Sequence, residues 1–417
     1  MLNKETINQV SKLVDSYENE IVDFLKKLIQ FPTPNPPGNE KDLQTWLAKT
    51  FTEWGYNVDV FDIYENSDTR PNVVGVLKGS GNGKSILLNG HIDVAEIPES
   101  ELPNWKYDPY SGEINEGHMY GRGTADMKGG VTSMIMATEI LRREGFKLKG
   151  DVIIQSVAGE ERGEPGTKKC IEKGYTADFG ICTEPTNQAI CPVSGGLIWL
   201  WINVKGKSIH NANRWSSIYP GGTTDGISAV EKGIKIMVAL QELERHWGRI
   251  KSHPLLPNGM ATINTGEISA GPSPAFSPDY CNIHCSLKIY PYEKVDDVVK
   301  EFRDYISLVS QTDPWLKNNP PEVLDPDLIW PPCDATASPG TNCLTDNHTA
   351  IMGEKPLVEG FVAVADNSWL SSAGIPTPLY GPGYLSEAHM KDEKIAISDL
   401  ISATKVLSAT ILDWCNS

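Results

Sequence analysis

The sequence predicts an α/β protein in which a mixed sheet covered by helices is interrupted by a smaller α+β unit. Strand-length apolar runs alternate with amphipathic segments through the first half of the chain. The pattern changes after about Pro192 and returns to strand, loop and helix from Leu357 to Trp414. At 417 residues the chain also exceeds the length of one ordinary core.

The first elements follow from apolar spacing and chain breakers. Residues 4–29 have helical periodicity, PTPNPPG at 32–38 ends it, and a second amphipathic helix is expected at 40–54. Strands are expected in three apolar runs, VDVFDI, NVVGVL and SILLNG. A helix at 129–143 and strands at 151–157 and 178–182 complete this half.

The inserted unit is expected at residues 193–310, between a first domain part at 1–192 and a second at 311–417. Its strands are IWLWINVKG and CNIHCSLKIYP. Its helices are expected at 222–247 and in KVDDVVKEFRDYISLV. A Pro- and Asp-rich stretch at 312–346 leads out of it. A unit of this size can fold around its own core.

Composition excludes two classes of partner. The chain has 37 basic and 54 acidic residues, a net charge of −17, and no long Lys/Arg cluster. Because phosphate binding begins with positive potential, we expect no nucleic-acid and no membrane partner. The N-terminal segment is polar, and no apolar run approaches the ~20 residues of a membrane span. We therefore expect a cytoplasmic protein with reduced cysteines.

Acidic and imidazole residues follow the predicted strands, where open α/β sheets bind ligands. In LLNGHIDV, His91 ends a strand and Asp93 lies two residues on, where a carboxylate can orient a ligand histidine. An isolated HxD is more often a surface pair. In YGRGTADMKGG, Asp126 lies between two glycine-bearing turns, a place that also suits an ordinary helix N-cap.

Adjacent carboxylates follow the strand at 151–157. In SVAGEERGEPG, neighbouring side chains point different ways, so one of Glu160 and Glu161 can bind metal while the other faces a water. Two like charges in a cleft are costly unless a cation or proton relieves them. The simpler alternative is a solvated acidic turn.

Two further positions complete the set. Glu184 follows a short strand in ICTEPT, and His389 follows the GPG turn in LYGPGYLSEAHMKDE. The simpler alternative for His389 is a loop histidine, with Asp392 and Glu393 facing solvent beside it. Two histidines and three carboxylates are nevertheless the ligand types of a dinuclear zinc site, with Asp126 as the natural bridge.

With these motifs, and with VKGKSIH and DPWLKNNPPEV, the chain resembles the M20 family of metallopeptidases, most of all its acetylornithine deacetylase / succinyl-diaminopimelate desuccinylase group. The motifs appear in the family's order over nearly the whole chain. The resemblance implies a zinc-peptidase-like catalytic domain interrupted by a lid domain that also forms a homodimer interface.

The resemblance also implies a ligand set and a cofactor. It assigns His91 and Glu184 to one metal ion, Glu161 and His389 to the other, and Asp126 to both. Two divalent ions per subunit are expected, as Zn²⁺ with Co²⁺ able to substitute.

Catalytic roles follow from the same resemblance. Glu160 would be the general base for a metal-activated water, because it is not itself a ligand. His210, in VKGKSIH, matches a lid histidine that reaches a neighbouring subunit's site and stabilises the oxyanion.

Departures from the family pattern concern the substrate. Lys288 in SLKIYP stands where the family carries an Arg that grips the substrate carboxylate, and a Lys lacks the bidentate fork. Backbone N–H groups around Gly381 and Gly383 could receive a carboxylate instead. The segment HNANRWSSIYPGG, with Trp215 and Tyr219, is either a longer surface loop or a bulky pocket wall.

The expected activity is hydrolysis of the amide bond of an N-acyl amino acid, a small carboxylate-bearing substrate. A dipeptidase, carboxypeptidase-like or aminohydrolase activity on an unusual, aromatic substrate is the alternative within the enzyme class. A binding module that keeps the fold without catalysis is the alternative from another class. ADNSWL keeps only Asp366 of the family's usual Asp-Ala pair.

Overall fold

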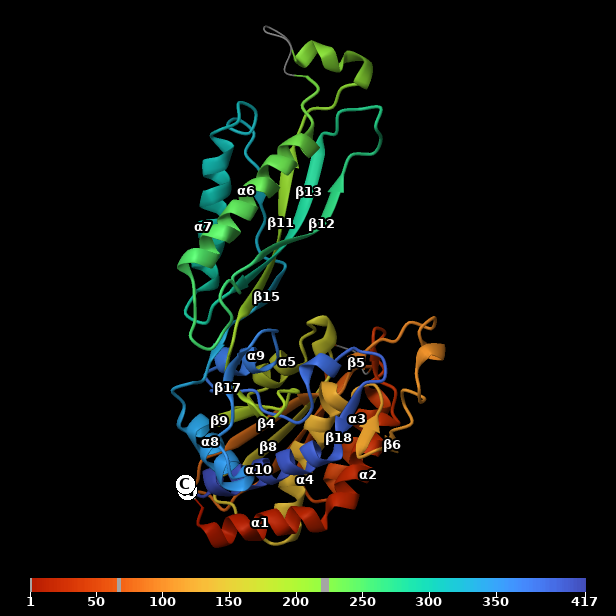
Figure 1. Cartoon of the computed structure of the whole chain (residues 1–417), viewed down its shortest axis with the longest axis vertical. Helices are drawn as coiled ribbons and strands as arrows, with labels where there is room; N and C mark the ends of the chain where they lie inside the picture. Colours follow the sequence, from red (N-terminus) through yellow and green to blue (C-terminus); the bar gives the residue numbers. More distant parts are fainter. Residues whose placement is uncertain (1, 66–68, 219–224) are drawn as a thin grey trace. The chain divides into compact units, whose positions relative to one another are not determined.

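The computed structural model describes residues 2–65, 69–218 and 225–417, and the chain divides into two compact units (Figure 1). Unit 1 consists of Met1–Val193, Cys333–Phe361 and Ala365–Ser417, and unit 2 consists of Ser194–Pro332 and Val362–Val364. Unit 2 therefore extends beyond the expected boundary at residue 310.

The boundary moves because two short strands after residue 310 belong to the unit 2 sheet. Strands β14 (Glu322–Val323) and β15 (Leu328–Trp330) both pair antiparallel with β11 (Gly196–Lys205). Their backbone hydrogen bonds were not foreseeable in a stretch rich in Pro and Asp.

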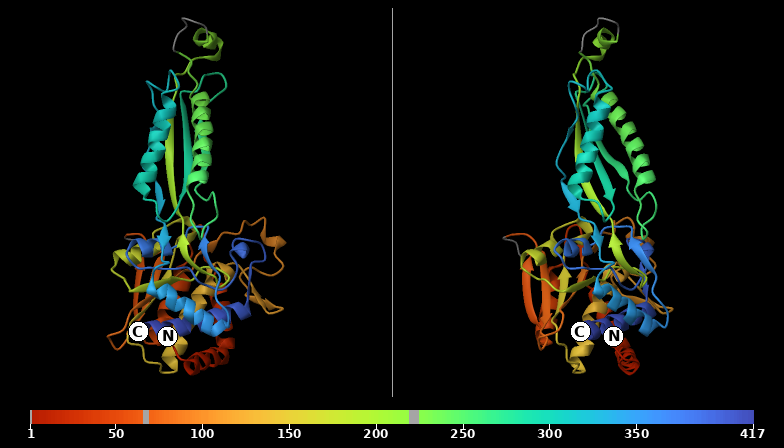
Figure 2. Two further views of the ribbon diagram at one scale, coloured as in Figure 1. Left: turned by 60° about the vertical axis from the view of Figure 1, so that its left-hand side comes forward. Right: turned by 90° about the vertical axis from the view of Figure 1, so that its left-hand side faces the viewer.

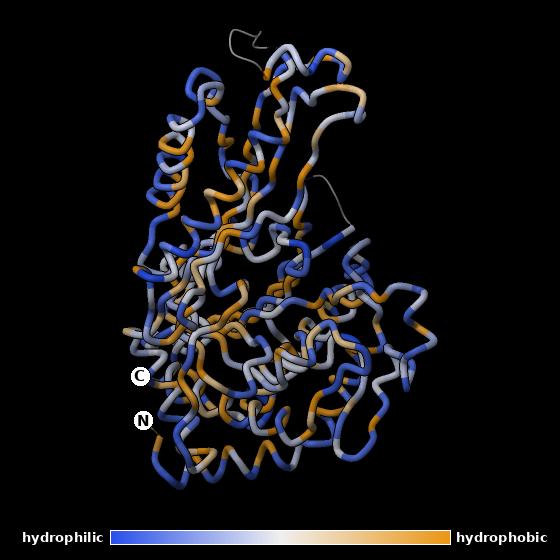
Figure 3. The backbone as a smooth tube through the Cα atoms, turned by 45° about the horizontal axis from the view of Figure 1, so that its top comes forward, coloured by the Kyte–Doolittle hydropathy of each residue, from blue (hydrophilic) through white to orange (hydrophobic). Residues whose placement is uncertain are grey.

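Unit 1 is built from eight α-helices among the described residues. They are α1 (Lys4–Ser16), α2 (Glu18–Ile29), α3 (Lys41–Glu53), α4 (Gly129–Arg143), α5 (Gly166–Glu172), α8 (Pro339–Met352), α9 (Asn367–Ser372) and α10 (Ile397–Cys415). The expected helix over 4–29 is two helices that meet at Tyr17. Along α1, blue and orange alternate in Figure 3 because apolar residues recur among polar ones, and the apolar Ile7, Val10 and Val14 are buried.

The main sheet of unit 1 has the strand order β2-β3-β8-β4-β9. Its strands are β2 (Asn57–Asp62), β3 (Pro71–Leu77), β4 (Ile86–His91), β8 (Val152–Val157) and β9 (Phe179–Cys182). β4 pairs parallel with both β8 and β9, whereas β2, β3 and β8 pair antiparallel. The sheet is mixed, as expected, and the carboxyl ends of β4, β8 and β9 share one edge.

Helices cover both faces of this sheet. On one face Val74, Leu87 and Ile153 pack with Cys170 of α5 and Leu370 of α9. Helices α3, α4 and α10 pack against the same strands elsewhere. Every residue of β4, β8 and β9 is buried, which explains their nearly continuous apolar sequences.

Smaller elements connect these layers in unit 1. They are the strands β1 (Pro34–Asn35), β5 (Val94–Ala95), β6 (Glu113–Asn115), β7 (His118–Tyr120), β10 (Ile190–Ser194), β16 (Cys333–Asp334), β17 (Val358–Phe361) and β18 (Lys394–Ala396), and the short helical turns η1 (Leu102–Asn104), η2 (Thr124–Lys128), η3 (Glu160–Arg162) and η5 (Leu385–Glu387).

Unit 2 is a sheet covered by helices on one face. Strands β12 (Ile263–Ala270), β13 (Tyr280–Ile289) and β11 pair antiparallel, and α6 (Ala229–Ile250) and α7 (Val295–Ser310) lie on the same side of them, as the right-hand view of Figure 2 shows. Burial alternates along β11 and β13, because only the face toward the helices is apolar.

Two expectations for unit 2 concern residues at or next to the segment 219–224, which the structure does not describe. The helix expected to begin at residue 222 starts at Ala229, capped by the Ser228 hydroxyl, and residues 219–224, including Tyr219, lie outside the described residues. The turn η4 (Asn211–Ser217) follows His210.

All eight cysteines are free, and seven of them are buried. Among the described helices, none combines the length and the apolar character that a membrane crossing requires.

Candidate functional site

The five expected metal ligands lie at or near one edge of the unit 1 sheet, although they come from distant parts of the sequence. His91 is the last residue of β4, Glu161 lies in η3 after β8, and Glu184 follows β9 by two residues. Asp126 lies in η2 before α4, and His389 lies in the loop before β18. This edge is where an open sheet with parallel strands binds ligands.

Glycines allow the neighbouring segments to approach Glu184. A Cβ atom on Gly130, in the first turn of α4, would lie 1.8 Å from the Thr183 carbonyl oxygen. A Cβ atom on Gly381 would lie 2.5 Å from the carbonyl oxygens of Thr183 and Glu184. A side chain at either position would push α4 or the 380–383 loop away from the ligand.

Asp126 lies between the two histidines, with one oxygen toward each. Its Oδ1 is 3.1 Å from Nε2 of His91, and its Oδ2 is 3.4 Å from Nε2 of His389. Nε2 of His91 is also 3.8 Å from Glu184 Oε1, and Nε2 of His389 is 2.9 Å from Glu161 Oε2. Two groups with metal-ligand spacing result, and Asp126 belongs to both.

The electrostatics of this cluster fit bound cations. Burial raises the pKa of Glu184 to about 8 and also raises the pKa of Glu161. Bonds to Asp126 and Glu161 raise the pKa of His389 to about 10. The carboxylates thus draw positive charge toward the space that they share with the imidazoles.

One carboxylate oxygen of the cluster has no hydrogen-bond partner among the described residues. Oε1 of Glu161 is buried without a hydrogen-bond partner, while its Oε2 faces His389. A buried carboxylate oxygen is costly unless it is paired or coordinates a metal. Imidazole nitrogen and carboxylate oxygen are suitable zinc ligands, so the residues present fit the expected metal site.

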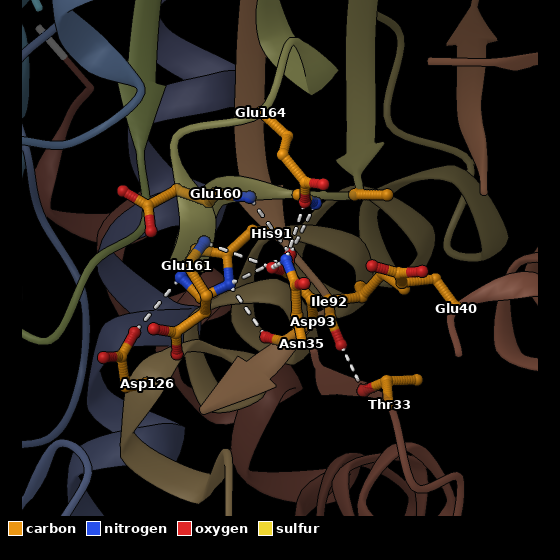
Figure 4. Close-up of polar contacts among 12 residues, drawn as sticks. Thr33, Asn35, Glu40, His91, Ile92, Asp93, Asp126, Glu160, Glu161 and Glu164 are labelled. Atoms are coloured by element: carbon orange, nitrogen blue, oxygen red, sulfur yellow. Dashed lines mark hydrogen bonds and ion pairs between the residues drawn. The ribbon is translucent and has the colours of Figure 1, made fainter. Parts of the chain in front are cut away.

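Glu160 lies beside the cluster and outside both ligand groups. In Figure 4 its side chain, like that of Glu161, lies on the Asp126 side of Asp93, whereas Glu40 lies on the other side. Burial raises the pKa of Glu160 well above its usual value, and the nearby Glu184 and Asp366 raise it further. A raised pKa makes this carboxylate a better proton acceptor than an exposed glutamate.

Asp93 is bonded differently from the sequence expectation. Its backbone carbonyl, 2.9 Å from Nδ1, contacts the His91 ring, whereas its carboxylate lies 3.7 Å from the same nitrogen. The carboxylate accepts the N–H groups of Gly159, Glu160 and Glu161. Asp93 therefore orients His91 through its main chain and the Glu160–Glu161 loop through its side chain.

Two residues of the site were not foreseen. Glu393, which the simpler interpretation placed in solvent, is fully buried and paired with Arg122 at 2.7 Å. Both contact the segments that carry Asp126 and His389. The sequence signal was present in the motifs GRG and EAHMKDE, but neither motif indicates that the two side chains meet.

Asp366 is also buried near the cluster. It is 3% exposed, and burial raises its pKa to about 6 despite a bond with Thr167. Thr167 in turn accepts a hydrogen bond from Asn89 of β4. Asp366 belongs to no ligand group among the described residues.

Two of the predicted residues lie in unit 2. His210 precedes η4, its Nδ1 accepts the Ala212 N–H, and its ring meets Phe276 edge to face. Lys288 lies on β13 and donates from Nζ to the Val362 carbonyl at 2.8 Å. Burial lowers the pKa of Lys288. Its ammonium therefore already has a hydrogen-bond acceptor within its own unit.

The two glycines proposed for carboxylate binding differ. The N–H of Gly381 donates to Thr186 Oγ1 at 3.1 Å, so it is already used. The carbonyl of Gly383 accepts the Asn187 N–H, and its φ of +82° explains why a glycine stands there. Of the two glycines, Gly383 is therefore the remaining candidate for binding a substrate carboxylate through its N–H group.

Comparison with known proteins gives long matches. The model of Peptidase family M20/M25/M40 matches residues 87–413. An N-formyl-4-amino-5-aminomethyl-2-methylpyrimidine deformylase from Bacillus subtilis (strain 168) is 38% identical over 99% of this chain and 98% of that protein. A deformylase of the same name from Halalkalibacterium halodurans is 39% identical over 100% of this chain and 99% of that protein. An acetylornithine deacetylase of Vibrio cholerae is 26% identical over 91% and 92%.

Solved structures show the same fold at lower identity. Aminopeptidase PepT from Bacillus cereus has a TM-score of 0.75 at 20% identity, covering 95% of this chain and 98% of that one. The YxeP protein of Bacillus subtilis, described as a dinuclear metal binding peptidase from the M20 family, has a TM-score of 0.67 at 16% identity, covering 96% and 98%.

The α/β sheet carries two groups of histidine and carboxylate side chains near its strand ends. This arrangement is typical of metal-dependent amidohydrolases and metallopeptidases. The chain belongs to peptidase family M20/M25/M40. The family expected from the motifs is therefore confirmed, and the protein is an enzyme of that hydrolytic type.

Proposed function

We propose that this enzyme removes the formyl group from N-formyl-4-amino-5-aminomethyl-2-methylpyrimidine or a close analogue. The observation that carries the proposal is identity of 38% and 39%, over nearly the full length, to two proteins named for that reaction. The deacetylase relative is only 26% identical. The reaction consumes water, breaks the formamide C–N bond, and releases formate and a primary amine.

The metal centre of this proposal uses the ligands described above. His91 and Glu184 would hold one Zn²⁺, Glu161 and His389 the other, and Asp126 both, with Co²⁺ able to substitute. When bound, the ions polarise the amide carbonyl and lower the pKa of water.

Glu160 is the proton carrier of the reaction. Its carboxylate accepts the proton that water loses on attacking the formyl carbon, and it delivers that proton to the departing amine nitrogen. Burial raises the pKa of Glu160 above its usual value, which favours its acceptance of the proton from water. Asp93 holds the backbone of residues 159–161, so it sets the direction in which Glu160 points.

A neutral substrate agrees with the surroundings of Lys288. The aminopyrimidine has no carboxylate, so the family's Arg has no partner to grip. Lys288, in its place, donates to the Val362 carbonyl, and burial lowers its pKa. The chain thus departs from the family pattern at the position where recognition of an N-acyl amino acid would require a cation that can bind the substrate carboxylate.

We also propose that the enzyme works as a homodimer in which His210 serves the neighbouring subunit. The M20 motif VKGKSIH supports this role, with the histidine stabilising the carbonyl oxygen that becomes negative. Glu160→Ala chains refolded with His210→Ala chains should regain activity, because one site of each mixed dimer is complete. Separable tags must first show that mixed dimers form.

The second candidate is hydrolysis of N-acyl amino acids, which the acetylornithine deacetylase relative favours. A parallel assay separates the two. The formylpyrimidine, N-acetylornithine and N-formylornithine are supplied with zinc, and the released amine is measured. We expect kcat/KM to be about 100-fold or more higher for the formylpyrimidine than for either ornithine amide. Equal or faster turnover of N-acetylornithine would reject the deformylase proposal.

A further inference from the structure

A buried ion pair joins the two loops that carry Asp126 and His389. Arg122 Nη1 lies 2.7 Å from Glu393 Oε2, and the two side chains are 5% and 0% exposed. Glu393 follows His389 by four residues, and Arg122 precedes Asp126 by four residues. Each partner of the pair therefore comes from one of the two ligand-bearing segments.

Glu393 binds the loop of Asp126 directly. Its Oε1 accepts the backbone N–H groups of Gly123, Ala125 and Asp126 at 3.0, 2.9 and 3.1 Å. A carboxylate that accepts several backbone N–H groups fixes the path of that backbone. The main chain of Asp126 is thereby placed by a residue of the His389 loop.

Arg122 binds the loop of His389 in return. Its Nη2 donates to the His389 carbonyl at 3.1 Å, and its Nη1 donates to the Met390 carbonyl at 3.3 Å. His389 has a φ of +60°, which a non-glycine residue adopts only when surrounding contacts determine it. The ring of Trp105 lies over the guanidinium at 5.4 Å.

We propose that Arg122 and Glu393 are positioning residues that set the separation of Asp126 and His389, and with it the affinity of the metal ion that these two ligands share. This inference rests on the proposed metal centre and is independent of the substrate. The contacts are reciprocal: Glu393, from the His389 loop, binds the backbone of the Asp126 loop, and Arg122, from the Asp126 loop, binds the backbone of the His389 loop. Neither residue is itself a ligand among the described groups.

Glu139 provides a matched control for a purely structural role. It is a fully buried carboxylate of α4 in the same unit, bonded to Arg142 and Arg143. Glu139→Gln and Glu393→Gln therefore make the same chemical change at equally buried carboxylates, each of which is 0% exposed, although Arg142 and Arg143 are more exposed than Arg122. Only Glu393 contacts the ligand-bearing loops.

The experiment titrates metal-free full-length protein with Co²⁺ and follows the visible spectrum, with Zn²⁺ calorimetry in parallel. In Glu393→Gln we expect one of the two ions to bind about 10- to 100-fold more weakly, with an altered Co²⁺ spectrum. In Glu139→Gln we expect binding like that of the wild type, whatever its loss of thermal stability. Wild-type affinity in Glu393→Gln, or equal weakening in both variants, would overturn the proposal.

Arg122→Lys keeps the test decisive if Glu393→Gln does not fold. This variant keeps a cation for Glu393 but cannot reach both carbonyls, because Lys lacks the planar fork. We expect weaker binding of the same single ion. Unchanged binding of both ions would overturn the proposal. The titration uses no substrate, so its result can be interpreted even if the deformylase assay fails.

Discussion

The sheets of the two units are covered differently. In unit 1 helices lie on both faces, and β4, β8 and β9 are buried along their whole length. In unit 2 the helices α6 and α7 lie on one face, and burial alternates along β11, leaving Trp199 40% exposed. His91, at the end of β4, and Glu184, just after β9, are accordingly only 1% and 5% exposed.

This difference changes the behaviour of acidic side chains. In unit 1 burial raises the pKa of Glu184 to about 8. In unit 2 burial also opposes ionisation of Asp313, but bonds from Lys232 and from two backbone N–H groups lower its pKa to about 2. Glu184 thus remains a carboxylate that a cation or a proton can still stabilise, whereas the charge of Asp313 is already balanced by Lys232. We expect substitutions at the unit 1 cluster to affect the chemistry, and substitutions in unit 2, apart from His210, to affect binding or stability.

The largest effect is expected at Glu160. Glu160→Gln should lower kcat by about 10²- to 10⁴-fold, because the proton carrier is lost, while both metal ions remain bound. The neighbouring Glu161→Gln is the control, and it should lose metal as well as turnover. Metal analysis and kinetics of the two variants check this. Loss of metal from Glu160→Gln with retention in Glu161→Gln would exchange the two roles.

A smaller effect is expected at Asp93. Asp93→Asn removes the charge that accepts three N–H groups of the Glu160–Glu161 loop, so kcat/KM should fall about 10- to 100-fold. Asp151→Asn is the control, because Asp151 also accepts a backbone N–H, from Gly79, but lies away from the ligands. Equal kinetic losses in both variants would remove the special role of the Asp93 contacts.

The effect expected at Lys288 of unit 2 is smaller again. Lys288→Met removes one hydrogen bond to Val362, so kcat/KM for the formylpyrimidine should change by about tenfold at most. N-acyl amino acids and their amides should be affected alike. A loss confined to the free acids would show instead that Lys288 meets a substrate carboxylate, and unit 2 would then share the recognition chemistry.

The smallest effect on activity is expected at Asp313, which is remote from the candidate ligands in sequence and belongs to unit 2. Because its folded pKa of about 2 lies below the usual 3.8, its ion pairing stabilises the fold above about pH 4 and is lost as the pH falls toward 2. Asp313→Asn should cost about 1–2 kcal/mol at pH 7 and little at pH 2, with kcat unchanged. Urea unfolding at both pH values measures this difference, and an equal cost at both would reject the electrostatic explanation.

Much of the fold was predictable because its signals are local. Apolar runs predicted β4, β8 and β9, and spacing predicted α4 over the residues observed. The break at Tyr17 and the strands after residue 310 were missed, because a helix end without a proline or glycine, and strands of two or three residues, leave little pattern.

The sequence by itself determined the residue types of the site and their places at strand ends, because an apolar strand followed by His or Glu is visible along the chain. Only the tertiary structure decided that Asp126 turns one oxygen toward His91 and the other toward His389. It also decided that Glu393 is buried against Arg122 and that Lys288 bonds to Val362. These contacts join residues far apart in sequence, and periodicity carries no information about which distant side chains meet once the chain has folded.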